Sequence, residues 1–134
     1  MRLNHVNLVV EDLDGAQGFF RRSFGFGLLD RKGDAVAVMN DGQGFTLVLS
    51  NVRAFGGEVP VRYPEGFHVG FILETQEEVD RAHGRLVADG ADIGREPRSM
   101  RDSYGVLLRS RRSWPIRTGA EPQFLCNFMQ NHNI

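Results

Sequence analysis

Hydrophobic residues in the first fifty positions follow two different periods. Four short segments rich in β-branched and apolar residues are predicted to be strands: residues 3–10, 28–30, 35–39 and 45–49. Between the first two, the apolar residues of segment 13–24 recur at helical spacing, and Gly25 is typical of a helix end. Asp41-Gly42 favours a tight turn between the last two strands. The first half of the chain is therefore predicted to have the order β-α-β-β-β.

The same order begins again after a linker. Residues 51–66 contain two prolines and three glycines and have little periodicity, so we expect no regular element there. A helix is predicted after Thr75, which forms a capping-box sequence with Glu78, and Gly90 is expected to end it. The strands expected in this half are residues 67–73, 91–93, 104–109 and, from a weaker pattern, 114–116.

The two halves of the chain are self-similar. Superposing them places His5 on His68 and the turn at Asp12 on the turn at Thr75. A repeat of this length indicates a duplicated supersecondary unit. The chain is thus expected to contain two copies of one module.

Both histidines are predicted to lie on the sheet face that the helices leave uncovered. In the first strand, Val6 and Leu8 belong to the more uniformly apolar face, which is expected beneath the helix, so His5 lies on the opposite face. The same argument applies to His68. A single strand histidine is more often a structural side chain than a ligand. A pair at matching positions is less easily explained in this way. Two imidazoles alone make a weak metal site, however, and a third ligand, usually a carboxylate, is needed.

Composition limits the classes of partner. The chain has 134 residues, 16 basic and 17 acidic side chains, and a net charge of -1, so neither nucleic acid nor an anionic membrane is an expected partner. Its length predicts one domain. The single cysteine, Cys126, cannot form an intramolecular disulfide, and no signal peptide is evident, which favours the cytoplasm. No apolar run approaches the roughly 20 residues that span a bilayer.

Several motifs resemble those of the vicinal oxygen chelate superfamily, which includes glyoxalase I, bleomycin and fosfomycin resistance proteins and extradiol dioxygenases. The first module carries Leu-Asn-His-Val-Asn-Leu-Val-Val-Glu-Asp-Leu-Asp and Phe-Phe-Arg-Arg-Ser-Phe-Gly-Phe. The second carries Pro-Glu-Gly-Phe-His-Val-Gly-Phe-Ile-Leu, Glu-Glu-Val-Asp-Arg-Ala-His and Ala-Asp-Gly-Ala-Asp-Ile. The resemblance covers roughly residues 1–109. It is specific for the fold but not for an activity, since one fold hosts many chemistries.

The resemblance implies an α+β fold in which two βαβββ modules form an open barrel, commonly completed as a homodimer. We expect a single domain over 1–134. Its parts would be module 1 at about 1–50, the linker at about 51–66, module 2 at about 67–117 and a divergent tail at about 118–134.

The resemblance also implies a metal site that this chain only partly matches. Metal-bearing members take one histidine from the first strand of each module, at the positions of His5 and His68. Their glutamate in the last strand falls at about Arg117, a cation, and the further glutamate of glyoxalase I falls near 46–48, where nothing is acidic. Glu121 is a candidate third ligand if the register slips, although an exposed tail glutamate is the simpler interpretation. A divalent metal (Zn, Ni, Mn or Fe) and no cofactor therefore both stay open.

Other signals are explained without a site. His83 is expected on the outer surface of the second helix, and Cys126 and His132 in the tail. An arginine cluster would suit an anionic substrate but is more often a solvated surface; it comprises Arg98, Arg101, Arg109, Arg111, Arg112 and Arg117. Neither a P-loop nor a Gly-x-Ser-x-Gly motif is present, so kinase and hydrolase functions have no support.

Two functions follow as hypotheses. One is a metal-free protein that binds a small molecule in the barrel, favoured because the third-ligand carboxylate is absent. The other is a divalent-metal-dependent lyase, isomerase or dioxygenase acting on vicinal oxygens, with His5 and His68 as ligands. In either case the predicted ligand-binding residues are Asn7, Met39, Leu47, Leu49, Gly70, Ile72 and Tyr104.

Overall fold

The computed structural model describes residues 1, 3–64, 67–89, 96–100, 103–109 and 125–130. The chain divides into two compact units, Met1–Val61 and Arg62–Ile134. Their boundary falls within the segment predicted as a linker. Each unit is described by itself below.

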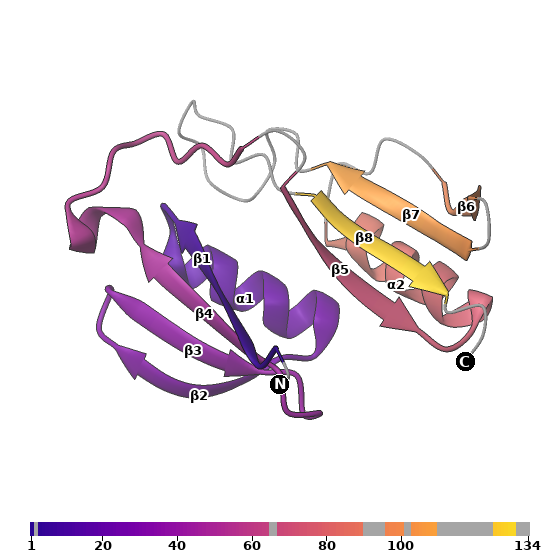
Figure 1. The fold of residues 1–134 in the computed structure, drawn as a ribbon, viewed down its shortest axis with the longest axis horizontal. Coiled ribbons are helices and arrows are strands. Elements are labelled where there is room, and N and C mark those ends of the chain that lie inside the picture. Colours follow the sequence, from indigo (N-terminus) through magenta and orange to yellow (C-terminus); the bar gives the residue numbers. More distant parts are fainter. Residues whose placement is uncertain (2, 65–66, 90–95, 101–102, 110–124, 131–134) are drawn as a thin grey trace. The chain divides into compact units, whose positions relative to one another are not determined.

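The first unit is a four-stranded sheet with one helix against one face (Figure 1). Its elements in chain order are β1 (His5–Val10), α1 (Leu13–Phe24), β2 (Gly27–Lys32), β3 (Val36–Asn40), β4 (Thr46–Asn51) and the 3-10 helix η1 (Val52–Phe55). The strands are ordered β1-β4-β3-β2, with β1 parallel to β4 and the other pairs antiparallel. The predicted order β-α-β-β-β is confirmed.

The second unit repeats this topology. Its elements are β5 (His68–Leu73), α2 (Gln76–Ala88), β6 (Arg98–Met100), β7 (Ser103–Arg109) and β8 (Leu125–Gln130). The strands are ordered β5-β8-β7-β6, and β5 is parallel to β8 as β1 is to β4. Two βαβββ units of equal connectivity confirm the α+β fold and the duplication that the sequence predicts.

Strands β5 and β7 confirm the strands expected at 67–73 and 104–109, whereas β6 and β8 were not expected. The strands predicted at 91–93 and 114–116, and Gly90, lie outside the described residues. The strand that pairs with β5 is β8, which runs through the segment expected to be a divergent tail. This pairing joins residues far apart in the chain, so the local hydrophobic pattern did not reveal it.

Alternation along the strands places the core of the first unit beneath α1. Phe20 is fully buried on the helix, and the strand residues buried with it share one face of the sheet: Leu8, Ala37, Met39, Leu47 and Leu49. Leu8 pairs with Leu49, and Met39 pairs with Leu47, which confirms that they lie on the same face. The helix therefore covers the Leu8 face and leaves the His5 face uncovered by α1.

Both helices begin with a side-chain cap. The carboxylate of Asp12 accepts a hydrogen bond from the amide of Gly15 at 3.0 Å. Thr75 and Glu78 form the predicted capping box, each accepting from the other's backbone N–H. Gly25 ends α1 with a φ of 74°, a left-handed conformation that favours glycine. These caps set where each helix starts above its sheet.

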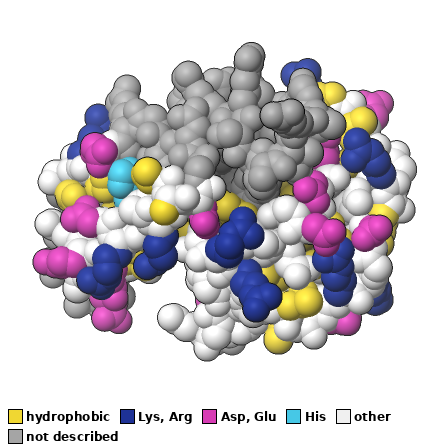
Figure 2. Space-filling view, turned by 180° about the vertical axis from the view of Figure 1, so that it is seen from behind, with side chains coloured by type: hydrophobic (Ala, Val, Ile, Leu, Met, Phe, Trp, Pro, Cys, Tyr) yellow, Lys and Arg dark blue, Asp and Glu magenta, His cyan; other side chains and the backbone are white. Residues whose placement is uncertain are grey.

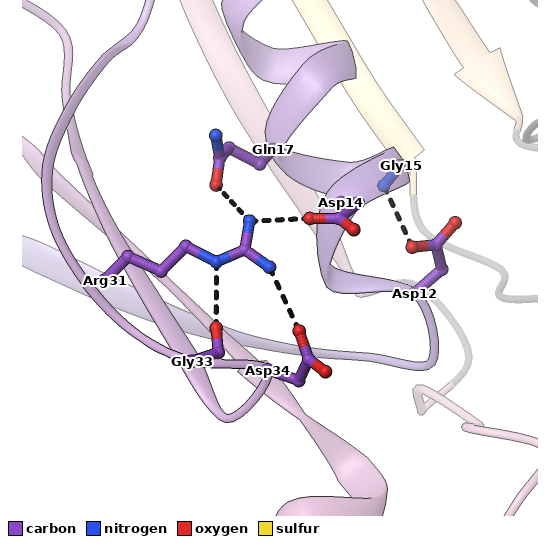
Figure 3. A network of polar contacts seen from close by, with 7 residues as sticks. All are labelled: Asp12, Asp14, Gly15, Gln17, Arg31, Gly33 and Asp34. Atoms are coloured by element: carbon purple, nitrogen blue, oxygen red, sulfur yellow. Dashed lines mark hydrogen bonds and ion pairs between the residues drawn. The ribbon is translucent and has the colours of Figure 1, made fainter.

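Arg31 ties the β2–β3 hairpin to the start of α1 (Figure 3). Its guanidinium donates to Gln17 at 2.8 Å and pairs with Asp14 at 2.6 Å, both on the helix. It also donates to the carbonyl of Gly33 at 2.8 Å and contacts the carboxylate of Asp34 at 3.4 Å. The planar fork of arginine suits such a set of acceptors. The hairpin and helix are thereby held together at one end of the sheet.

The predicted linker is partly structured. It contains η1, and Val52 and Val61 are buried. Glu11, directly after β1, accepts a hydrogen bond from the amide of Val61 at 2.8 Å. Burial and this hydrogen bond hold the segment against the first unit.

No helix among the described residues is long and apolar enough to cross a membrane.

Candidate ligand-binding faces of the two sheets

The two histidines occupy equivalent positions in their units. His5 is the first residue of β1 and pairs with Thr46, the first residue of β4. His68 is the first residue of β5 and pairs with Leu125, the first residue of β8. The equivalence predicted from the repeat therefore holds at the level of strand register.

His5 is exposed, and its ring is oriented by a neighbour. Its Nδ1 lies 2.7 Å from the side-chain oxygen of Asn4. Because an amide oxygen only accepts, this contact assigns the proton to Nδ1. This contact engages Nδ1 and leaves Nε2 as the ring nitrogen that could contact a metal ion or ligand.

A polar pair lies beyond His5 on the same face. The hydroxyl of Ser50 donates to the side-chain oxygen of Asn7 at 2.8 Å. This hydrogen bond joins β1 to β4 and confirms that Asn7 and Ser50 share a face. Ser50 is buried, with 7% of its surface exposed, whereas Asn7 is exposed. Asn7 is thus the accessible member of the pair.

Valines surround this polar pair. Strand register places four half-buried valines on the His5 face, and they are Val9, Val36, Val38 and Val48. Val48 is opposite Asn7, and Ser50 lies between Val9 and Val36. The face therefore combines an apolar surface with a few hydrogen-bonding groups, which is typical of small-molecule sites.

Three predicted ligand-binding residues lie on the wrong face for this site. Met39, Leu47 and Leu49 are at most 1% exposed and belong to the core beneath α1. The difference from the prediction arises from the composition of the strands. Strand β3 reads Val-Ala-Val-Met-Asn, apolar on both faces, so the sequence pattern did not show which residues point toward the helix. The residues that lie on the His5 face instead are their neighbours Val38, Val48 and Ser50. This follows from the pairing of β4 with β1 and β3, which the sequence pattern does not show.

Tyr104 also lies on the helix side of its sheet. Its hydroxyl donates to the carboxylate of Asp80, on α2, at 2.8 Å. That hydrogen bond, followed by partial desolvation and the negative charges of Asp80 and Glu96, raises the pKa of Tyr104 above its ordinary value. Tyr104 therefore contacts α2 and does not share a face with His68, contrary to the prediction.

Gly70 and Ile72 alternate with Val69 and Phe71 along β5, as predicted. Both are exposed, and 70% of the surface of Ile72 is accessible. Strand alternation places them on the His68 face. Across the register, Gly70 pairs with Asn127 and Ile72 with Met129. These positions form the counterpart, in the second unit, of the His5 face.

Among the candidates that lie in the described residues, none adds a metal ligand. The ring of His83 is half-buried on α2, with Nδ1 3.7 Å from a carboxylate oxygen of Glu96. Glu121 and His132 lie outside the described residues, as does Arg117. Arg98 is an exposed residue of β6. Within the described ranges, no three His, Cys, Asp or Glu side chains gather as a metal site would require.

The last strand of each unit contains no acidic residue. Strand β4 reads Thr-Leu-Val-Leu-Ser-Asn and β8 reads Leu-Cys-Asn-Phe-Met-Gln. A set of two imidazoles without an acidic oxygen donor is poor for the divalent ions that such sites hold. The segment around Arg117, where the resemblance places the glutamate, lies outside the described residues.

Charge on the visible surface is mixed. Figure 2 shows Lys and Arg side chains interspersed with Asp and Glu over the face that it displays. This agrees with the net charge of -1. The described part of that face has no extended basic surface of the kind that binds nucleic acid.

Comparisons with known proteins identify relatives over most of the chain. A family model described as the Glyoxalase/Bleomycin resistance protein/Dioxygenase superfamily matches residues 2–108. A solved structure of a possible Glyoxalase from Bacillus cereus is 32% identical, with a TM-score of 0.71 and coverage of 96% of this chain and 98% of that one. A search of curated proteins found no match.

More distant solved structures share the fold. A lactoylglutathione lyase from Agrobacterium tumefaciens is 19% identical, with a TM-score of 0.68 and coverage of 95% of this chain and 92% of that chain. The fosfomycin resistance protein FosX from Listeria monocytogenes is 15% identical, with a TM-score of 0.72 and coverage of 98% and 94%. At these identities the likeness concerns the fold alone.

Proposed function

The chain belongs to the Glyoxalase/Bleomycin resistance protein/Dioxygenase superfamily, and on that premise we propose that it binds a small molecule without a bound metal ion. The proposed binding surface is the sheet face of the first unit that α1 leaves uncovered. In the first unit this surface is the His5 face, with Asn7, Ser50 and the four valines.

One observation carries this proposal: the His5 face is apolar and neutral at its centre, and the strands that would complete a metal site lack a carboxylate. Half-buried valines provide contact area for an apolar ligand, because removal of their surface from water contributes roughly 25 cal/mol per Å². Asn7 adds a hydrogen-bonding group that orients the ligand. Binding therefore needs no ion.

The substitution Val48→Arg tests this proposal. It places a cation in the middle of the face, where it blocks an apolar ligand while the core beneath α1 is untouched. We expect neutral aromatic compounds to shift the amide NMR resonances of the His5 face in the original chain. Val48→Arg should abolish these shifts.

The matched control is Phe55→Arg, in η1, because Phe55 is 66% exposed and belongs to the same unit. It should leave binding unchanged. The proposal is wrong if no compound shifts the His5 face, or if Val48→Arg binds the compounds as well as Phe55→Arg does.

A second candidate is a divalent-metal-dependent enzyme. The equivalent positions of His5 and His68 at the starts of β1 and β5 favour it. These two residues would hold the ion, and a bound divalent ion would supply Lewis-acid stabilisation of adjacent substrate oxygens. His5 fits this role because its Nε2 is the available nitrogen. The candidate further requires an oxygen ligand from outside β4 and β8.

A further inference from the structure

We infer that the ligand of the His5 face is an uncharged carbonyl compound, such as a carboxamide or ketone, whose oxygen accepts a hydrogen bond from the side-chain amide of Asn7. This inference rests on the proposed small-molecule binding and names the class of ligand. It makes Asn7 the residue that determines specificity and Ser50 the residue that positions it.

The hydrogen bond between Ser50 and Asn7 decides which group is offered to a ligand. The hydroxyl of Ser50 has one proton, and it donates this proton to the side-chain oxygen of Asn7 at 2.8 Å. With that oxygen engaged, the amide orientation of Asn7 is set and its Nδ2 presents two N–H donors. Because Asn7 is exposed and Ser50 is buried, a ligand meets the donors of Asn7.

The other asparagine on this face is committed elsewhere. The side-chain nitrogen of Asn40 donates to the carbonyl of Phe45 at 3.3 Å, and its oxygen accepts from the amide of Gly42 at 2.7 Å. Asn40 therefore stabilises the turn between β3 and β4. The described contacts thus use the oxygen and one N–H of Asn40, whereas at Asn7 they use the oxygen alone.

The charge of the face selects against an anion. The positions on β1, β3 and β4 that share this face carry no carboxylate, lysine or arginine. The charged positions nearest to them are Asp30 and Lys32 on β2, which pair with Val38 and Val36 and are opposite in sign. An anion placed among the valines would lose its hydration without gaining a net positive partner, and such a loss is costly. A neutral carbonyl oxygen makes the same hydrogen bond without that cost.

Benzamide and benzoate are the probes that separate these cases, because they have nearly the same shape and differ in charge. Toluene serves as the apolar reference. We expect benzamide to shift the Nδ2 resonances of Asn7 and to bind about tenfold more tightly than benzoate at neutral pH, because only the carboxylate of benzoate loses the hydration of a charge.

The variant Asn7→Asp keeps an oxygen for Ser50 but removes both N–H donors. We expect it to weaken benzamide binding by about tenfold, and toluene binding much less. The matched control is Asn51→Asp, on the same strand as Ser50 but on the opposite face; its side-chain oxygen accepts from the amide of Arg53, a role that aspartate retains. It should leave both affinities unchanged.

The variant Ser50→Ala tests the positioning role. It frees the amide of Asn7 to rotate, so benzamide binding should fall while toluene binding is kept. A purely structural role for Ser50 would instead weaken both probes together, and that result overturns the assignment.

The remaining outcomes distinguish this inference from the proposed function. If toluene binds to the His5 face and benzoate binds as tightly as benzamide, or if Asn7→Asp keeps full benzamide affinity, the ligand class is wrong while small-molecule binding stands. If none of the three probes perturbs the His5 face, both proposals are wrong.

Discussion

At the scale of single residues, the face on which a side chain lies decides its role. Asn7 and Leu8 are neighbours in β1, yet Asn7 is exposed beside Ser50 and Leu8 is fully buried beneath α1. His5 follows the same alternation, and its contact with Asn4 selects the nitrogen that is presented. Strand alternation therefore places the polar residues of the candidate site on the His5 face and their sequence neighbours in the core beneath α1.

Tyr104 provides a prediction at this scale. Because ionisation would break its hydrogen bond to Asp80 and place two negative charges together, its pKa is raised. A raised folded-state pKa means that the interaction stabilises the fold fully below the ordinary tyrosine pKa of about 10. The contribution is lost as pH rises through the folded-state value.

We therefore expect Asp80→Ala to move the tyrosinate titration of Tyr104 to lower pH. Absorbance in a Tyr63→Phe background measures it, since the chain has only two tyrosines. Glu77→Ala, which removes an exposed carboxylate from the first turn of the same helix, is the control. Equal titration midpoints in Asp80→Ala and Glu77→Ala would contradict the assigned cause.

At the scale of elements, strand pairing organises both units. In each unit the first strand lies at one edge of the sheet and pairs in parallel with the last strand, as β1 does with β4 and β5 with β8. The helix that connects the first strand to the rest covers one face of the first unit's sheet (Figure 1). The opposite face is thereby left uncovered by α1, so the two faces of β3 contribute differently to stability.

Neighbouring residues of β3 test that difference. Met39→Ala removes a fully buried side chain from the core and should lower the free energy of unfolding by about 2–5 kcal/mol. Val38→Ala, on the half-buried face, should cost about 1 kcal/mol. Chemical denaturation measures both. Similar losses for the two variants would show that the face assignment is incorrect.

At the scale of the whole molecule, duplication is the main feature. Two units with the same connectivity each begin with a histidine-bearing strand. The second candidate function, a metal-dependent enzyme, needs one residue from each unit, whereas the proposed metal-free binding needs only one face. The expected homodimer and cytoplasmic location stay predictions.

Metal analysis separates the two functions. In protein purified without chelator, we expect no stoichiometric divalent metal, because β4 and β8 supply no acidic ligand. His5→Ala and His68→Ala should not change this result. One ion per chain, lost in both variants but retained in the control His83→Ala, would instead establish the metal-dependent alternative.

The sequence by itself determined the periodic features: both helices with their starts at Asp12 and Thr75, the strands of the first unit, and the repeat that aligns His5 with His68. These follow from local spacing and capping chemistry, which each segment carries within itself. Only the tertiary structure decided that β8 pairs with β5, that Met39, Leu47 and Leu49 are core residues, and that Tyr104 contacts α2. Strands apolar on both faces acquire an inside and an outside only when their partners and a covering helix are in place.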